Sequence, residues 1–220
     1  MVSDKLPIAV DLDGTLIQSD SVVEAAAWMW SHRPLRMLWL ALVEGTMSRA
    51  RFKWKLYGQS CFAPPACNEA LLAWLKERKK EGRYLILMSA APQFRADSVA
   101  GNLQGLFDEV VGSTQNENRR YKKKADWLVK RFGRKQFDYV GNSQADIPAW
   151  QASATAYNVN PSKSLKKSAL AAGVVLVQLA ECPQAEAMER WDDWLRVWKW
   201  LRWALLLLLI VLVSCGTLKK

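Results

Sequence analysis

Two acidic residues near the start of the chain are the strongest candidates for chemistry. Asp11 and Asp13 lie at the end of the apolar run Pro7–Leu12. In an extended chain residues i and i+2 point to the same side, so the two carboxylates project together. Carboxylates this close repel each other unless a cation lies between them or one keeps a proton. In such a pair one carboxylate can attack phosphorus, while the other exchanges protons with the departing oxygen and with water.

The segments around this pair alternate between short apolar runs and longer amphipathic stretches. Runs typical of buried parallel strands occur at Pro7–Leu12, Tyr84–Met88, Glu109–Val111, Phe137–Val140, Ala154–Tyr157 and Val174–Val177. Helical spacing of apolar residues is found at Asn68–Lys80 and Lys124–Phe132. This alternation predicts an open α/β fold with a parallel sheet, in which binding sites gather at the carboxyl ends of the strands.

The segment Asp11-Leu12-Asp13-Gly14-Thr15 resembles the first motif of the haloacid dehalogenase (HAD) superfamily, and three further motifs follow in the family's order over roughly residues 7–180. The resemblance implies a Rossmann-like parallel sheet and, as in most members, a phosphatase that uses an aspartyl phosphate and Mg²⁺. It makes Asp11 the nucleophile and Asp13 the general acid and base. Gly14 and Thr15 would lie beside the bound phosphate.

The second and third motifs of the family supply a hydroxyl and a cation. The second resembles LILMS, where the hydroxyl of Ser89 would bond a phosphoryl oxygen and Ala90 would line the substrate site. Taken alone, Ser89 is better explained as an ordinary serine at a strand end. The third motif resembles KADWL, whose Lys124 would neutralise the phosphate and orient the nucleophile. Lys122 and Lys123 are rivals for this role, and the basic cluster could instead be a solvated surface.

The fourth motif departs from the family pattern at one position. The segment from Gly141 to Asp146 resembles the family's GDxxxD, but Asn142 stands where the family has an acid that binds magnesium. An amide oxygen can coordinate Mg²⁺ without a formal charge, so we expect weaker binding. The predicted metal site consists of Asp11, Asp13, Asn142 and Asp146. An intact site is favoured, and a catalytically impaired binding or regulatory domain is the alternative.

A helical insert separates the first motif from the remainder of the predicted fold. Residues 19–67 lack a convincing strand and match the small α-helical cap of phosphoserine-phosphatase-like members, which leaves 1–18 and 68–183 for the HAD-like core. Arginine, lysine and tryptophan alternate along the insert. This pattern indicates either a solvated basic face over an apolar core or a lid or lipid contact that supplies cations to a phosphate-bearing substrate.

Composition limits the possible functions further. The chain has 220 residues, of which 50% are hydrophobic, and this fits one domain with a modest appendage rather than a disordered or large multidomain protein. A formal charge of +10 favours anionic partners such as phosphorylated substrates or acidic lipid. No recognised nucleic-acid motif accompanies the basic clusters, so nucleic-acid binding is not expected. The four cysteines form no CxxC pair, and the single histidine has no second histidine to join it in a metal site.

The carboxyl-terminal residues favour attachment to a membrane. Residues 203–218 are uncharged and, as a helix, would span ~24 Å of the ~30 Å hydrocarbon core of a bilayer. Residues 184–202 are rich in tryptophan and arginine, the mixture typical of a headgroup interface. We predict an amphipathic juxtamembrane helix followed by a single transmembrane segment, with the catalytic domain in the cytoplasm because no export signal precedes it. The alternative is a buried core helix.

A closer resemblance concerns the N-terminal HAD-like domain that is fused to UbiA-type membrane prenyltransferases in bacteria. It rests on VDLDGTLIQSD, on RFGRKQFDYVGNSQADIPAW and on the basic, tryptophan-rich stretch before the apolar segment. The resemblance implies a phosphorylated small molecule or a lipid-linked substrate, with a polyprenyl-linked or isoprenoid-pathway compound as one candidate. It also implies a possible prenyltransferase partner. Under it, the chain is either a free-standing anchored phosphatase or the truncated N-terminal part of such a fusion.

Overall fold

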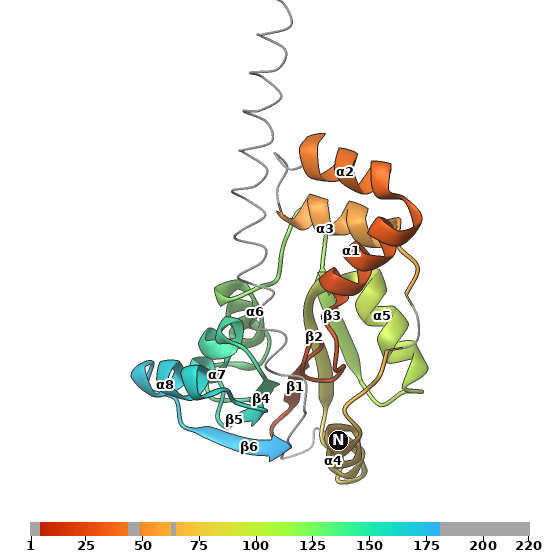
Figure 1. The fold of residues 1–220 in the computed structure, drawn as a ribbon. Coiled ribbons are helices and arrows are strands. Elements are labelled where there is room, and N and C mark those ends of the chain that lie inside the picture. Colours follow the sequence, from red (N-terminus) through yellow and green to blue (C-terminus); the bar gives the residue numbers. More distant parts are fainter. Residues whose placement is uncertain (1–4, 44–48, 63–64, 181–220) are drawn as a thin grey trace, which may run out of the picture. The chain divides into compact units, whose positions relative to one another are not determined.

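A six-stranded parallel sheet forms the centre of the fold (Figure 1). The computed structural model describes residues 5–43, 49–62 and 65–180. The strands are β1 (Ile8–Asp11), β2 (Leu85–Pro92), β3 (Glu109–Ser113), β4 (Asp138–Gly141), β5 (Ala156–Val159) and β6 (Leu176–Ala180). They are ordered β3-β2-β1-β4-β5-β6, and every neighbouring pair runs parallel. The predicted parallel α/β fold is confirmed.

Helices cover both faces of this sheet. They are α1 (Ser21–His32), α2 (Pro34–Val43), α3 (Arg49–Gly58), α4 (Glu69–Lys80), α5 (Gln93–Asn102), α6 (Lys122–Phe132), α7 (Ile147–Ala152) and α8 (Lys163–Ala171). Buried residues of α4 and α5 share one apolar cluster with the insert helices α1–α3. Buried residues of α6, α7 and α8 form the second cluster. The result is three layers, with the sheet in the middle.

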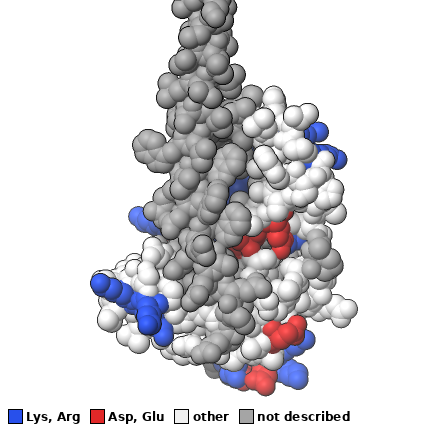
Figure 2. Space-filling model, in the orientation of Figure 1, with Lys and Arg blue, Asp and Glu red and all other residues white. Residues whose placement is uncertain are grey.

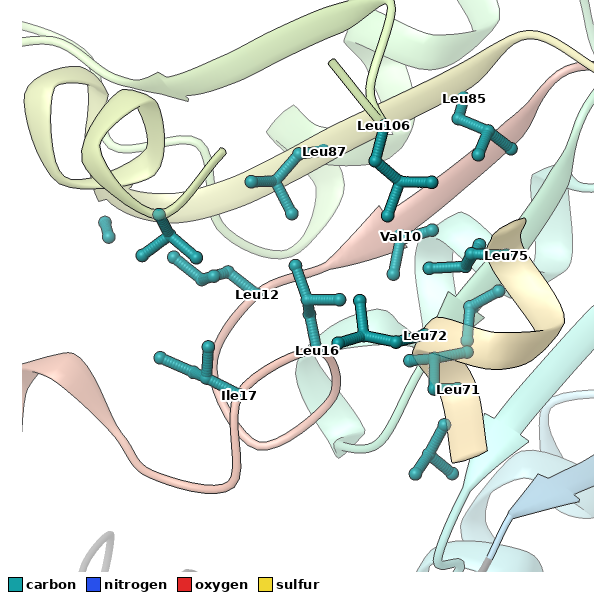
Figure 3. Packing of buried hydrophobic residues seen from close by; sticks show 14 of the residues in the cluster. Val10, Leu12, Leu16, Ile17, Leu71, Leu72, Leu75, Leu85, Leu87 and Leu106 are labelled. Carbon is teal, nitrogen blue, oxygen red and sulfur yellow. The ribbon is translucent and has the colours of Figure 1, made fainter. Parts of the chain in front are cut away.

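Apolar side chains alternate between the two faces of the sheet. In β1, Ile8 and Val10 belong to one buried cluster, whereas Ala9 packs in the other. This alternation follows from the two-residue repeat of an extended chain. Figure 3 shows the first cluster, in which leucines of α4 face β1, β2 and the segment that follows β1. Strands covered on both faces read as continuous apolar runs, which is why the sequence signalled them clearly.

Local polar contacts fix where the helices next to the site begin. The side chain of Asp20 accepts hydrogen bonds from the backbone of Val22 and Val23 and caps α1. Asn68 caps α4 in the same way, by accepting from the backbone N–H of Leu71. Each cap satisfies amide groups that the first turn of a helix leaves without a partner. The helical insert is therefore anchored at its entrance and at the start of the helix that follows it.

All six strands differ from their predicted bounds by at least one residue, and the largest difference is at the end of β2. β2 continues to Pro92, beyond the predicted end at Met88, because a register shift lets Pro92 pair with Ser113 of β3. β5 and β6 each begin two residues later than predicted. Ahead of β6, Gly173 forms a turn with a φ of 73°. Apolar residues in these turns extended the predicted runs past the hydrogen-bonded strands.

Within the described residues, no helix is long and apolar enough to cross a membrane. The predicted juxtamembrane helix (184–202) and membrane segment (203–218) lie outside those residues. On the face shown in Figure 2, acidic side chains lie near the middle and again at the lower edge, and basic side chains occupy several separate places. One of these basic groups lies over α8, whose lysines are exposed.

Candidate active site

The candidate residues meet at the carboxyl ends of the central strands. β1 lies between β2 and β4, and the chain crosses from one side of β1 to the other between β3 and β4. In open parallel sheets the crevice at such a switch point is the usual place for a ligand. Asp11 ends β1, Ser89 lies in the last part of β2, and Asn142 directly follows β4. The topology alone therefore brings three of the four predicted motifs to one edge.

Lys124 connects the first and fourth motifs through buried contacts. Its ammonium lies 2.5 Å from Oδ1 of Asp11 and 3.2 Å from Oδ1 of Asp146. It also donates a hydrogen bond of 2.8 Å to the hydroxyl of Tyr139. The side chain of Lys124 is only 4% exposed, whereas those of its predicted rivals Lys122 and Lys123 are exposed. The structure thus places Lys124, of the three consecutive lysines, against the predicted nucleophile.

Asp146 organises the turn after β4. Its Oδ2 accepts hydrogen bonds from the backbone of Asn142 (3.2 Å) and Ser143 (3.1 Å) and from the hydroxyl of Ser143 (3.0 Å). Its Oδ1 accepts from Tyr139 at 2.7 Å. A Cβ atom at Gly141 would lie 2.7 Å from Cγ of Asp146, so the glycine is needed for this close approach. With both oxygens bonded, Asp146 is arranged to orient Lys124 and the 142–143 backbone.

Asp13 lies in the turn that follows β1. Its Oδ1 accepts hydrogen bonds from the backbone N–H (2.9 Å) and the hydroxyl (2.6 Å) of Ser21, at the start of α1. Gly14 adopts a φ of 70°, a conformation that favours glycine, and this allows the chain to turn immediately after Asp13. The buried hydroxyl of Thr15 has no hydrogen-bond partner among the described residues. The turn therefore holds Asp13 by one oxygen and leaves an unsatisfied hydroxyl close by in sequence.

The end of β2 carries further polar groups. Ser89 is fully buried, and its Oγ accepts a hydrogen bond of 2.9 Å from the backbone N–H of Ala91. The hydroxyl proton of Ser89 remains able to donate to a ligand. The carbonyl of Ala90 accepts from Ser113 at 3.0 Å and from Lys53 at 3.4 Å. Because Lys53 belongs to α3, this contact connects the helical insert to the strand end that carries Ser89.

The burial of these charges shifts their protonation. Burial raises the pKa of Asp11 to about 7, although the ammonium of Lys124 acts in the opposite direction. Burial alone would lower the pKa of Lys124, but the carboxylates of Asp11 and Asp146 raise it above its usual value. Burial likewise opposes the ionised form of Asp146, yet Lys124 and the bonds from Tyr139 and Ser143 lower its pKa. The cluster therefore holds Lys124 and Asp146 charged, while Asp11 exchanges its proton near neutrality.

The oxygens at this edge fit Mg²⁺, the cofactor that the family resemblance implies. Mg²⁺ prefers oxygen ligands, which the carboxylate of Asp11, the oxygens of Asp13 and the amide of Asn142 supply. Oδ1 of Asn142 is buried and accepts no hydrogen bond from a described residue, so it is available to a cation. The described residues contain no cluster of three His, Cys, Asp or Glu side chains suited to a metal. The three predicted carboxylates Asp11, Asp13 and Asp146 therefore do not form such a cluster by themselves.

Several residues of the site were not predicted from the sequence. Tyr139 bonds both Lys124 and Asp146, but in the sequence it is one aromatic residue of an apolar strand. Ser21 holds Asp13, and Lys53 approaches the end of β2 from the insert. A signal for Tyr139 was present: a hydroxyl on a fully buried strand requires a partner. Nothing local in the sequence marked Lys53 among the basic residues around it.

Comparison with known proteins assigns most of the described chain to one family. The family model of haloacid dehalogenase-like hydrolases matches residues 8–151. The uncharacterized protein y4nM of Sinorhizobium fredii (strain NBRC 101917 / NGR234) is 31% identical over 198 residues, which are 89% of this chain and 38% of y4nM. The chain therefore spans less than half the length of that relative.

Solved structures extend the likeness to the fold. A predicted phosphatase from Clostridium acetobutylicum has a TM-score of 0.58 at 14% identity, with 86% of this chain and 99% of that chain covered. A phosphoserine phosphatase with bound substrate has a TM-score of 0.53 at 15% identity, with 76% and 91% covered. The family match covers more than half of the 220 residues, and the parallel sheet agrees with it. The chain belongs to the haloacid dehalogenase-like hydrolase family.

Proposed function

We propose that the chain is a Mg²⁺-dependent phosphomonoesterase in which Asp11 is the nucleophile and Asp13 the general acid and base. The observation that carries the proposal is the buried contact of Asp11 with Lys124 and, through it, with Asp146 at the carboxyl end of β1. An ammonium held against a carboxylate in this way is suited to neutralise charge on a transferring phosphoryl group. The phosphatase folds among the structural neighbours support the same reaction class.

Each proposed step is performed by a side chain of this edge. An oxygen of Asp11 attacks phosphorus, and the bond from phosphorus to the ester oxygen breaks. Asp13 gives a proton to the departing alcohol, then takes one from the water that attacks the aspartyl phosphate and releases phosphate. Oδ1 of Asp11 accepts a hydrogen bond from Lys124. No described residue donates a hydrogen bond to Oδ2, so Oδ2 is available for the attack. Ser89 and Lys124 would hold the phosphoryl oxygens during both steps.

The proposal assigns the metal to Asp11, Asp13 and Asn142, with Asp146 beside them. When bound, Mg²⁺ supplies positive charge that offsets the phosphoryl oxygens. Asn142 contributes an oxygen without a charge, and the unpartnered state of that oxygen supports its role as a ligand. The contacts of Asp146 support an indirect role, in which it fixes the backbone that carries Asn142.

The membrane context forms a further part of the proposal. The apolar residues 203–218 and the tryptophan-rich stretch before them support attachment to a bilayer, with the catalytic domain on the cytoplasmic side. An enzyme held there would meet amphiphilic phosphates, so we include a lipid-linked or isoprenoid phosphomonoester among the proposed substrates. We also propose a prenyltransferase partner. The matched region is only 38% of y4nM, so that relative has many residues beyond the part that resembles this chain. Detergent-dependent extraction of the full chain from membranes tests the attachment.

Hydrolysis of a generic aryl phosphate by the purified chain tests the proposed reaction. We expect turnover that requires Mg²⁺, and we expect Asp11→Asn to lower it by at least ~100-fold because the amide cannot act as the nucleophile. Asp97→Asn is a suitable control, since Asp97 is an exposed aspartate on α5. Unchanged turnover in Asp11→Asn would reject the assignment.

Asn142 favours a second candidate function, a binding or regulatory domain that has lost most of its activity. The amide lacks the charge of the acid that the family has at this position, which weakens the attraction for a divalent cation. Restoring the acid with Asn142→Asp distinguishes the two candidates. A silent parent that gains metal-dependent hydrolysis in this variant would favour the impaired domain. An active parent that gains only in Mg²⁺ affinity would favour the phosphatase.

A further inference from the structure

The helix α2 of the insert exposes an apolar stripe. Leu35, Leu38 and Trp39 have the i, i+3, i+4 spacing that places side chains on one face of a helix, and they are 82%, 41% and 52% exposed. On the opposite face Leu40 is fully buried, and Met37 packs against the first apolar cluster. Figure 1 shows α2 on the side of α1 and α3 that faces away from the sheet. The stripe therefore points away from the protein core.

Trp30 adds a second exposed tryptophan near the end of α1, a helix that contacts α2. The side chain of Trp30 is 56% exposed. Even at ~250 Å² for each complete side chain, the four apolar residues together leave less than ~600 Å² in contact with water. Apolar patches of ~300–600 Å² on a monomer often serve a function, whereas a stable protein–protein interface needs ~800 Å² from each partner. The patch therefore fits a binding surface but is small for a stable protein interface.

Basic residues flank the stripe, and acidic residues are scarce around it. Residues 25–62 contain six Arg or Lys and one acid, Glu44. Arg33 connects α1 to α2, and Arg36 follows Leu35 on α2. Both arginines are exposed, and neither forms an ion pair with a described residue. Leucine and tryptophan beside unpaired arginines are the combination with which a helix lies in the interfacial layer of a bilayer that contains anionic lipid.

We propose that this exposed face of the insert docks on the surface of a bilayer that contains anionic lipid. The face, called the α2 face below, consists of Trp30, Leu35, Leu38 and Trp39, with Arg33 and Arg36 beside it. Its apolar side chains would enter the boundary between headgroups and acyl chains, and its arginines would bind lipid phosphates. The insert begins after the turn that holds Asp13, at the carboxyl edge of the sheet. Docking would therefore hold the candidate active site close to the bilayer surface.

Photocrosslinking from the α2 face identifies what covers it. The full chain with p-benzoylphenylalanine in place of Leu35 is irradiated on phosphatidylcholine vesicles with and without phosphatidylglycerol. We expect adducts to lipid acyl chains, with a yield ~5-fold higher when phosphatidylglycerol is present, the factor that one arginine near an anionic surface supplies. The same probe in place of Ala73, an exposed residue of α4, is the matched control and should give few lipid adducts. Adducts to residues 184–220 or to a second copy of the chain, or no lipid adduct at all, would overturn the proposal.

Single substitutions separate the apolar part of the contact from the charged part. With the probe at position 35, Trp39→Gln should lower the yield of lipid adducts ~5-fold on both kinds of vesicle, because half of an indole no longer leaves water. Arg36→Gln should lower the yield ~5-fold only when phosphatidylglycerol is present. Leu170→Gln is the control, since Leu170 is a 70% exposed leucine on α8. Equal losses in Trp39→Gln and Leu170→Gln would refute the role of the α2 face.

The α2 face and the membrane attachment proposed for residues 203–218 can fail separately. If extraction of the chain requires detergent but the probe at position 35 gives no lipid adduct, the attachment stands and the α2 face is wrong. If a salt wash releases the chain, yet the probe forms lipid adducts on anionic vesicles and high salt reduces them, the α2 face stands and the attachment is wrong. Neither measurement uses phosphatase turnover, so both outcomes are independent of the proposed reaction.

Discussion

Replacing Lys124 with methionine measures how strongly the buried cluster depends on its cation. The side chains of Lys124, Asp11 and Asp146 are 4%, 11% and 1% exposed, and the ammonium lies 2.5 Å and 3.2 Å from the two carboxylates. Removing one partner of a buried ion pair costs ~3–5 kcal/mol, because the remaining charge is left without compensation. At a urea slope of ~2 kcal/mol per M, the unfolding midpoint should fall by ~2 M.

The stability that Lys124→Met loses should increase as the pH rises. Burial raises the pKa of Asp11 to about 7 in the parent, and removing the ammonium that opposes this effect raises the pKa further. A carboxyl group with a raised pKa in the folded state favours folding only while it keeps its proton. Its contribution is complete below its unfolded pKa of ~4 and is lost as the pH rises through the folded pKa. Lys124→Met should therefore be more destabilising at pH 8 than at pH 5.

Urea unfolding followed by circular dichroism at both pH values tests this reasoning. Lys123→Met is the matched control, because Lys123 precedes Lys124 on α6 and is exposed. We expect the control to change the free energy of unfolding by less than ~1 kcal/mol at either pH. The account of the cluster is wrong if Lys124→Met behaves like the control at pH 8, or if its loss of stability is larger at pH 5.

Three further outcomes follow from the same contacts. Gly141→Ala should lower stability by ~1–3 kcal/mol in thermal unfolding, since its Cβ would lie 2.7 Å from Cγ of Asp146. Gly101→Ala is the control and should not lower stability, because its Cβ would have nothing within 4 Å. Equal melting temperatures for the two variants would contradict this prediction. Tyr139→Phe should lower kcat ~10-fold, with KM nearly unchanged, because the hydrogen bond from Tyr139 to Asp146 is lost. A variant with the kcat of the parent would exclude a positioning role for Tyr139. Mg²⁺ affinity measured by calorimetry should fall about tenfold per pH unit below pH 7, because a proton on Asp11 competes with the cation; an affinity independent of pH would exclude Asp11 as a ligand.

The sequence predicted the sheet because its strands are buried on both faces. Val10 and its neighbours in β1 form an apolar run that ends in polar residues, and this local pattern is enough to indicate a parallel strand and the edge where a ligand binds. Helices gave a weaker signal in the sequence: α5 carries a weak apolar repeat and buries Arg95 in place of an apolar side chain. The exact strand ends depend on pairing with neighbouring strands, which a local pattern does not contain.

The acidic pair and Lys124 could be located by motif and order, but their supporting contacts could not. Ser21 lies 8 positions from the aspartate that it holds, and Lys53 lies 37 positions from the carbonyl that it approaches. Such pairs form only when the insert folds back over the strand ends, and sequence spacing does not encode that approach.

Chemical trapping of the phosphoryl group tests the central claim most directly. The purified chain is mixed with excess aryl phosphate and Mg²⁺, quenched in acid and reduced with borohydride, which converts an aspartyl phosphate into homoserine. We predict homoserine at position 11 by mass spectrometry of the peptide that contains Asp11, and none in the Asp11→Asn variant. Phosphate release with residue 11 unmodified, or homoserine at Asp13 instead, would contradict the account.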